Sequence, residues 1–204
     1  MTRIFLTRHG ETEWNLQGRV QGSLDSALTE RGRQQARFLA QRLRPEGVQY
    51  IYSSDLPRAL ATAEEIRISL GLSNLTVSPA LREQSFGEWE GRVWAELREE
   101  YPDVFRVWDS EPHNARIPRG ETMSEALNRA WAFFSQTVLE HPRETLCFVT
   151  HGLTLKLLVT KCLGYQVHDW DKTPWQHNTA LNLLEYRNGV FTPCYLGDCS
   201  HLAS

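Results

Sequence analysis

The segment Ile4-Phe5-Leu6-Thr7-Arg8-His9-Gly10 decides the fold of this chain. Its three apolar residues give way abruptly to polar ones, which is the pattern of a buried strand that feeds a loop. The pattern returns at residues 145–150, where a second apolar run ends in His151 and Gly152. Ligands of parallel sheets bind beyond the carboxyl ends of the strands, so we expect both histidines to project into one crevice.

Strand and helix patterns alternate along the rest of the chain. Apolar residues at helical spacing follow Thr29, an expected helix N-cap, and Thr122 with Glu125 forms the pattern of a capping box. Asn188-Gly189 is typical of a hairpin turn. The expected helices cover residues 29–44, 59–71, 122 to about 141 and about 154–162. The expected strands cover residues 4–6, 50–53, 75–78, 145–150, 180–186 and 190–195.

This alternation predicts a three-layer α/β/α sandwich with a mostly parallel central sheet, because crossover helices must cover both faces of such a sheet. Glycines, prolines and tryptophans divide residues 79–118 into short helical pieces. We interpret about 79–120 as a small helical lid inserted into a single domain that spans residues 1–204.

Composition excludes several classes of protein. Hydrophobic residues make up 41% and charged residues 23% of the chain, which is the balance of a folded domain. The formal charge is −3, and the basic residues are scattered, so no nucleic-acid partner is expected. No apolar run is long enough to span a bilayer, and residues 1–8 lack a signal-peptide pattern. We therefore expect a cytoplasmic protein without membrane contact.

Charged residues beside the two histidines indicate the kind of ligand. Arg8 precedes His9, and Arg58 follows the expected strand at residues 50–53. Guanidinium groups bind phosphate oxygens in a bidentate manner and stay charged at neutral pH. A metal is the rival use for the histidines, but no H-x-x-x-H pair is present, and adjacent arginines would repel a cation. We expect no metal and no cofactor.

Leu6-Thr7-Arg8-His9-Gly10-Glu11-Thr12-Glu13-Trp14-Asn15 resembles the signature of the histidine phosphatase superfamily, which includes the cofactor-dependent phosphoglycerate mutases. Further segments fall in the family's order along nearly the whole chain, and the tail at residues 197–201 is similar to that of the broad-specificity phosphatases. These segments are Leu28-Thr29-Glu30-Arg31-Gly32, Ser53-Ser54-Asp55-Leu56-Pro57-Arg58-Ala59, Leu81-Arg82-Glu83, Gly87-Glu88-Trp89-Glu90-Gly91 and Val149-Thr150-His151-Gly152.

The resemblance implies a role for each matching residue. His9 is implied as the nucleophile and Glu83 as the proton donor, with Arg8, Arg58 and His151 around the transferred phosphoryl group. Further substrate contacts are implied for the side chains of Asn15 and Gln21 and for the backbone at Gly152 and Leu153.

These roles make chemical demands on the site. The His9 ring must be neutral at the attacking nitrogen, so its other nitrogen should donate to a nearby carbonyl. A protonated His151 would help the arginines to stabilise the charge of the transition state. Glu83 would protonate the leaving alkoxide and then activate the water that cleaves the phosphohistidine.

The expected function is hydrolysis of a small phosphorylated metabolite without a metal, with broad specificity as one option. Phosphoserine, α-ribazole phosphate and sugar phosphates stay open as substrates, and Trp89, Trp94, Phe105 and Trp108 either face the leaving group or pack the lid. The alternatives are a phosphoglycerate mutase, which needs extra basic groups and a cover against water, and an inactive phosphate-binding regulatory domain. The chain is expected to be a monomer or a homodimer.

Overall fold

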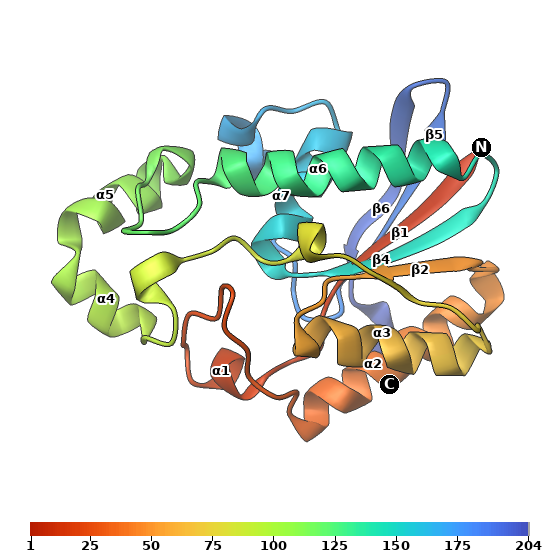
Figure 1. The fold of residues 1–204 in the computed structure, drawn as a ribbon, viewed down its shortest axis with the longest axis horizontal. Helices are drawn as coiled ribbons and strands as arrows, with labels where there is room; N and C mark the ends of the chain where they lie inside the picture. Colours follow the sequence, from red (N-terminus) through yellow and green to blue (C-terminus); the bar gives the residue numbers. More distant parts are fainter. Residues whose placement is uncertain (204) are drawn as a thin grey trace.

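The computed structural model describes residues 1–203, which contain a six-stranded sheet between layers of helices (Figure 1). The strand order is β3-β2-β4-β1-β5-β6. The four strands from β3 to β1 pair in parallel, β5 pairs antiparallel with β1, and β6 pairs antiparallel with β5. The prediction of a mostly parallel sheet is therefore confirmed. The strands are β1 Thr2–Arg8, β2 Tyr50–Ser53, β3 Thr76–Val77, β4 Thr145–Thr150, β5 Leu181–Arg187 and β6 Val190–Asp198.

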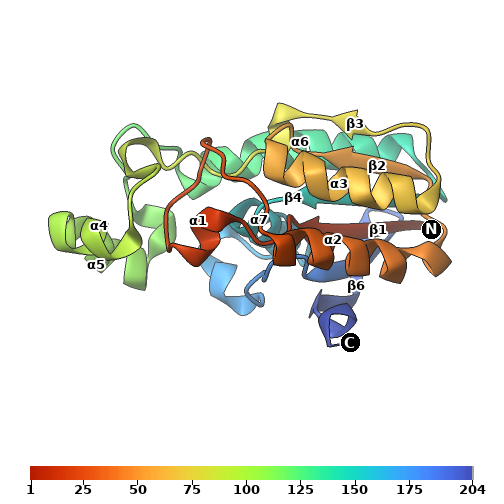
Figure 2. The same ribbon diagram turned by 90° about the horizontal axis from the view of Figure 1, so that it is seen from below.

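Helices cover both faces of the sheet (Figures 1 and 2). On one face lie α2 (Glu30–Leu43) and α3 (Pro57–Leu70), and on the other α6 (Met123–Glu140) and α7 (Gly152–Cys162). Successive side chains of β1 serve the two layers in turn. Phe5 packs in the cluster under α2 and α3, whereas Ile4 and Leu6 pack in the cluster under α6 and α7. This arrangement confirms the three-layer prediction.

Local signals in the sequence locate most helix ends. The Thr29 side chain accepts the N–H of Gly32 at 2.9 Å, and Thr122 forms the expected capping box with Glu125. The expected start of the last helix at Thr154 was wrong, because α7 begins at Gly152. A short helix α1 (Glu13–Leu16), which the sequence did not predict, lies inside the signature segment.

The region expected to form a lid contains two helices, α4 (Trp94–Glu100) and α5 (Pro102–Ser110), which lie at one end of the molecule in both views (Figures 1 and 2). The region has its own apolar cluster, in which the buried rings of Trp89 and Phe105 stack with centroids 4.8 Å apart. Single-turn and two-turn 3₁₀ helices lie at Arg44–Glu46, Pro79–Leu81, Gly87–Trp89, Pro112–Asn114, Val167–Lys172 and Ser200–Leu202.

Strand register brings the two histidines together. β4 lies between β1 and β2, and Arg8 of β1 is opposite Thr150 of β4. The residues that follow these two, His9 and His151, therefore leave neighbouring strands at the same edge. The backbone N–H of His9 still donates to the carbonyl of Thr150 at 3.0 Å, which ties the two loops at their starting point.

Candidate active site

Two buried imidazole rings form the centre of this edge. The centroids of His9 and His151 are 5.2 Å apart, with an angle of 60° between the ring planes. Nδ1 of His9 lies 2.7 Å from the carbonyl oxygen of Gly10, and because a carbonyl only accepts, this nitrogen carries the ring proton. The lone pair is then on Nε2, as attack on phosphorus requires.

Two arginines flank the rings, Arg58 buried and Arg8 partly buried. Nη1 of Arg8 donates to the Gln176 carbonyl at 2.9 Å. Arg58 donates to the Gly22 carbonyl at 2.8 Å and to the Asp25 carboxylate at 2.9 Å. Burial is the main cause that lowers both pKa values, to about 10 for Arg8, so both groups stay charged at neutral pH. Within residues 1–203, the buried Nε atom of each arginine has no partner, so each keeps a donor for a ligand.

The same surroundings keep both histidines neutral in the free site. Burial, followed by the charges of Arg58 and Arg8, lowers the pKa of His9 well below 6.5. Burial, followed by Arg58, His9 and Arg8, does the same to the pKa of His151. This shift applies to the free site, whereas the expectation of a protonated His151 concerns the transition state, in which the phosphoryl group is bound. A neutral ring can still donate, and Nδ1 of His151 is buried without a partner in the described part of the chain.

Glu83 reaches the site from the segment that precedes the lid. Its carboxylate accepts the backbone N–H groups of Leu153 and Thr154 at 3.1 and 3.0 Å and the Thr154 hydroxyl at 3.1 Å. Glu83 thus caps α7 from outside the helix. The N–H expected of Leu153 as a substrate contact is occupied here. The N–H of Gly152 has no acceptor among residues 1–203 and is available to an oxyanion.

These side chains surround one cavity of about 330 Å³. The sequence-predicted site residues that line it are Arg8, His9, Asn15, Gln21, Arg58, Glu83, Gly152 and Leu153. His151 is fully buried and lies against the edge of His9, outside the cavity lining. The side-chain oxygen of Gln21 is buried without a partner among the described residues. The structure therefore brings the whole predicted set to one place.

The structure also adds residues that the sequence did not indicate. Ser54 lies 2.8 Å from Nε2 of His151, and Asn178 donates to the His9 carbonyl at 3.1 Å. Gln176, Asn178 and Thr179 all contact the Arg8-His9 segment. These residues form a polar run directly before β5, whereas both histidines follow their strands. Because β5 runs antiparallel to β1, its start lies at the same edge of the sheet.

The outer cavity wall is aromatic with two additional cations. Trp94, Trp108, Trp170 and Trp175 line it, together with Arg19 and Arg98. Trp89 and Phe105 do not line it, so for these two the packing alternative holds. Arg98 is paired with Asp109 through two hydrogen bonds of 2.6 and 2.8 Å, which offset its charge.

Fold and site together define a class: α/β proteins that hold an anionic ligand between paired histidines and arginines beyond the carboxyl ends of parallel strands. The sequence profile described as "Histidine phosphatase superfamily (branch 1)" matches residues 4–198. The chain belongs to this superfamily, as the signature segment predicted.

Individual relatives cover almost the whole chain. Phosphoserine phosphatase 1 of Hydrogenobacter thermophilus is 33% identical over 97% of this chain and 96% of its own. A protein of Yersinia pestis named probable phosphoglycerate mutase GpmB is 37% identical over 99% and 95%. The solved structure of Bacillus stearothermophilus YhfR superposes with a TM-score of 0.93, at 36% identity, over 99% of this chain and 100% of that one.

Membrane-spanning helices and clusters of metal ligands are both absent from residues 1–203. None of the helices in residues 1–203 is long and apolar enough to cross a membrane. Over the same residues, no group of three or more His, Cys, Asp or Glu side chains has an arrangement that could hold a metal ion.

Proposed function

We propose that this protein hydrolyses phosphate monoesters without a metal, through a phosphorylated His9. The observation that carries the proposal is the position of His9, whose Nδ1 is held by the Gly10 carbonyl while the ring lines a cavity together with Arg8 and the buried Arg58. A neutral imidazole with a free Nε2 is a nucleophile, and buried guanidinium groups stabilise the charge on the phosphoryl oxygens.

The phosphoryl group is transferred twice, first to Nε2 of His9 and then to water. Nε2 of His9 forms a bond to phosphorus as the bond to the leaving oxygen breaks, and Glu83 gives that oxygen a proton. A bound phosphate dianion beside Glu83 favours the protonated carboxyl group, since like charges disfavour ionisation. Glu83 then takes a proton from the water that attacks phosphohistidine, which releases inorganic phosphate and restores His9. His151 donates from Nδ1 to a phosphoryl oxygen, and the negative charge beside it favours the protonated ring in the transition state.

Hydrolysis rather than isomerisation is favoured by the charges around the cavity. A mutase must bind a second anionic group and exclude water. Of the two additional cations, Arg98 has its charge offset by Asp109. Four tryptophans line the same wall. This wall suits the leaving groups of varied small metabolites, so we include broad specificity in the proposal. Phosphoglycerate mutase activity is the second candidate, and the name of the Yersinia relative supports it.

Three further parts of the proposal concern the whole chain. Residues 1–204 act as one domain, with about 79–120 as the lid over the cavity. The ligand is a small phosphorylated metabolite, because a cavity of about 330 Å³ leaves little room for a polymer. The protein works as a monomer or a homodimer, which light scattering would distinguish.

The test is release of inorganic phosphate from a panel of phosphomonoesters in EDTA between pH 5 and 8. Isomerisation of 3-phosphoglycerate, with its bisphosphate primer, is measured in parallel. We expect hydrolysis to survive EDTA and to vanish in His9→Ala, while isomerisation is negligible. Turnover retained by His9→Ala would exclude the phosphohistidine mechanism. Isomerisation faster than hydrolysis would establish the mutase, and no activity at all would favour the regulatory domain.

The matched control is His141→Ala. His141 is partly buried and hydrogen-bonds Tyr52 and Glu144 beyond the C-terminal end of α6, away from the cavity. Its loss should lower thermal stability yet leave hydrolysis unchanged, so a loss of activity in His9→Ala alone is assigned to chemistry.

A further inference from the structure

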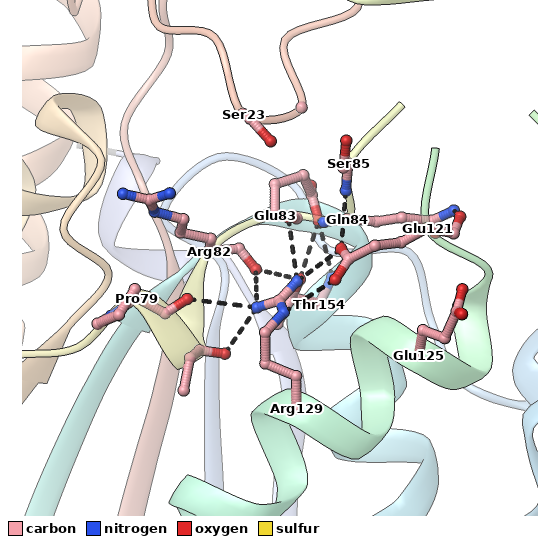
Figure 3. A network of polar contacts seen from close by, with 12 residues as sticks. Ser23, Pro79, Arg82, Glu83, Gln84, Ser85, Glu121, Glu125, Arg129 and Thr154 are labelled. Atoms are coloured by element: carbon pink, nitrogen blue, oxygen red, sulfur yellow. Dashed lines mark hydrogen bonds and ion pairs between the residues drawn. The ribbon is translucent and has the colours of Figure 1, made fainter. Parts of the chain in front are cut away.

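Arg129 of α6 forms hydrogen bonds to the main chain at Glu83 and just before it (Figure 3). Its Nη1 donates to the carbonyl oxygens of Ala80 and Arg82 at 2.8 and 3.2 Å. Its Nη2 donates to the carbonyl oxygen of Glu83 itself at 3.3 Å. A single guanidinium therefore fixes the backbone on the approach to Glu83 and at Glu83.

Glu121 pairs with the same guanidinium group and also holds the main chain after Glu83 (Figure 3). Its two carboxylate oxygens accept from Nε and Nη2 of Arg129 at 3.0 and 2.8 Å. The same carboxylate accepts the N–H of Ser85 at 2.9 Å, and the Glu121 carbonyl accepts the Gln84 side chain at 2.6 Å. The backbone is thus tied on both sides of Glu83 by one ion pair, whose partners are each only 27% exposed.

Glu83 has a second tether, but the proposed chemistry interrupts it. The carboxylate holds the Leu153 and Thr154 N–H groups, and an oxygen that carries a proton for the leaving group is a weaker acceptor for them. The main chain before Glu83 is also held by two hydroxyl groups, since Thr150 donates to the Leu81 carbonyl at 2.7 Å and Thr154 donates to the Arg82 carbonyl at 2.9 Å. At Glu83 itself, Arg129 is the donor to the main-chain carbonyl. The position of this main chain at the moment of proton transfer therefore depends in part on the Arg129–Glu121 pair.

We infer that Arg129 and Glu121 are positioning residues for the proton donor. The inference rests on the proposed role of Glu83. Arg129 does not line the cavity, so it acts on the reaction through the placement of the Glu83 main chain. A small displacement of a catalytic group costs rate in the step that uses that group and not in others.

The test compares kcat/KM for an aryl and an alkyl ester in Arg129→Met and in the gentler Arg129→Lys. kcat/KM reports the first transfer, in which the leaving group departs. p-Nitrophenolate is a weak base that leaves without a proton, whereas the alkoxide of phosphoserine needs one. We expect a loss of at least tenfold for phosphoserine and less than threefold for p-nitrophenyl phosphate. Equal losses for the two esters, or no loss, would overturn the inference.

Two further variants separate this inference from the proposed function. Glu83→Gln should show the same preference more strongly, and adding Arg129→Met to it should cost little more. If Glu83→Gln slows both esters equally, the proton donor is misassigned; if Glu83→Gln is selective and Arg129→Met is not, only the positioning role fails. Arg42→Met is the matched control, since Arg42 is as buried as Arg129 and pairs with Glu46 at the C-terminal end of α2. It should leave both esters unchanged.

Discussion

Arg8 and Arg58 have two roles in the proposed mechanism. They attract the phosphate, and by their charge they oppose protonation of His9 and His151, whose pKa values burial already lowers. A protonated His9 could not attack, so the cations that bind the substrate also keep the nucleophile in its reactive form. The cost of burying these charges is met by main-chain carbonyls and Asp25.

Ser54 orients the ring of His151. Its hydroxyl oxygen accepts the N–H of Leu56 at 3.3 Å and lies 2.8 Å from Nε2 of His151. With the hydroxyl as donor to Nε2, the ring proton is on Nδ1. We expect Ser54→Ala to lower kcat/KM about tenfold, equivalent to about 1.4 kcal/mol, because the ring loses this orientation. Steady-state kinetics with p-nitrophenyl phosphate measures the effect.

Ser53→Ala serves as the control for Ser54→Ala. Ser53 is equally buried, and its hydroxyl donates to the Ser54 carbonyl at 2.9 Å without touching a histidine. A similar loss of activity in both variants would mean that Ser54 supports packing and does not orient the ring of His151.

The positions of His9, Arg8 and Arg58 around one cavity could be predicted from sequence because each follows an expected strand or lies in the signature segment. The supports could not be predicted. Ser54 contacts a residue 97 positions away, and Gln176 contacts one 168 positions away. Nothing in a local pattern distinguishes such a serine or glutamine from a residue that only packs. The lowered pKa of His151 in the free site depends on charges that meet only in the folded chain, so no local pattern indicates it.

At the scale of elements, α2 starts in close contact with the loop that carries His9. A Cβ placed on Gly32 would lie 2.0 Å from the carbonyl oxygen of Glu11, and one on Gly10 would lie 2.4 Å from that of Gly32. We expect Gly32→Ala to lower the free energy of unfolding by about 2 kcal/mol, because either the first turn of α2 or the loop must move. Urea denaturation measures the loss.

Arg33→Ala controls for the change of helix composition. Arg33 is the next residue of the same turn and is exposed. Its replacement should stay within about 0.5 kcal/mol of the parent protein. Gly32→Ala with parental stability would show that the backbone contact is soft.

The sequence predicted the elements whose signals are local. Thr29 and Thr122 marked helix starts, and β2 was predicted with its observed bounds. The start of α7 was missed because its cap is Glu83, 70 residues earlier, whereas Thr154 has the composition of a cap. The four residues of α1 are too few to show a periodic pattern.

For the molecule as a whole, the neutral histidines predict sensitivity to acid. A histidine in the unfolded chain titrates near 6.5, whereas burial and the arginines lower the pKa of His9 and His151 well below that value. Below pH 6.5 the unfolded chain binds protons that the folded chain does not, so stability falls. Each histidine contributes up to about 1.4 kcal/mol per pH unit to this fall.

The contribution of one ring is measured by comparing His151→Asn with the parent protein in urea at pH 7.5 and 5.5. The variant should lose less stability on acidification, by up to about 1.4 kcal/mol per pH unit below 6.5. Parallel pH dependence in the two proteins would mean that His151 is charged in the folded state.

The cap on α7 provides a way to observe Glu83, the proposed acid of the reaction, in the resting protein. The amide hydrogens of Leu153 and Thr154 are bonded to Glu83, so their exchange with solvent deuterium depends on whether that carboxyl group holds a proton. Two backbone resonances thus become an indicator for a side chain 70 residues earlier. Followed across a titration with vanadate, they would report when the active site takes up the proton that it later delivers.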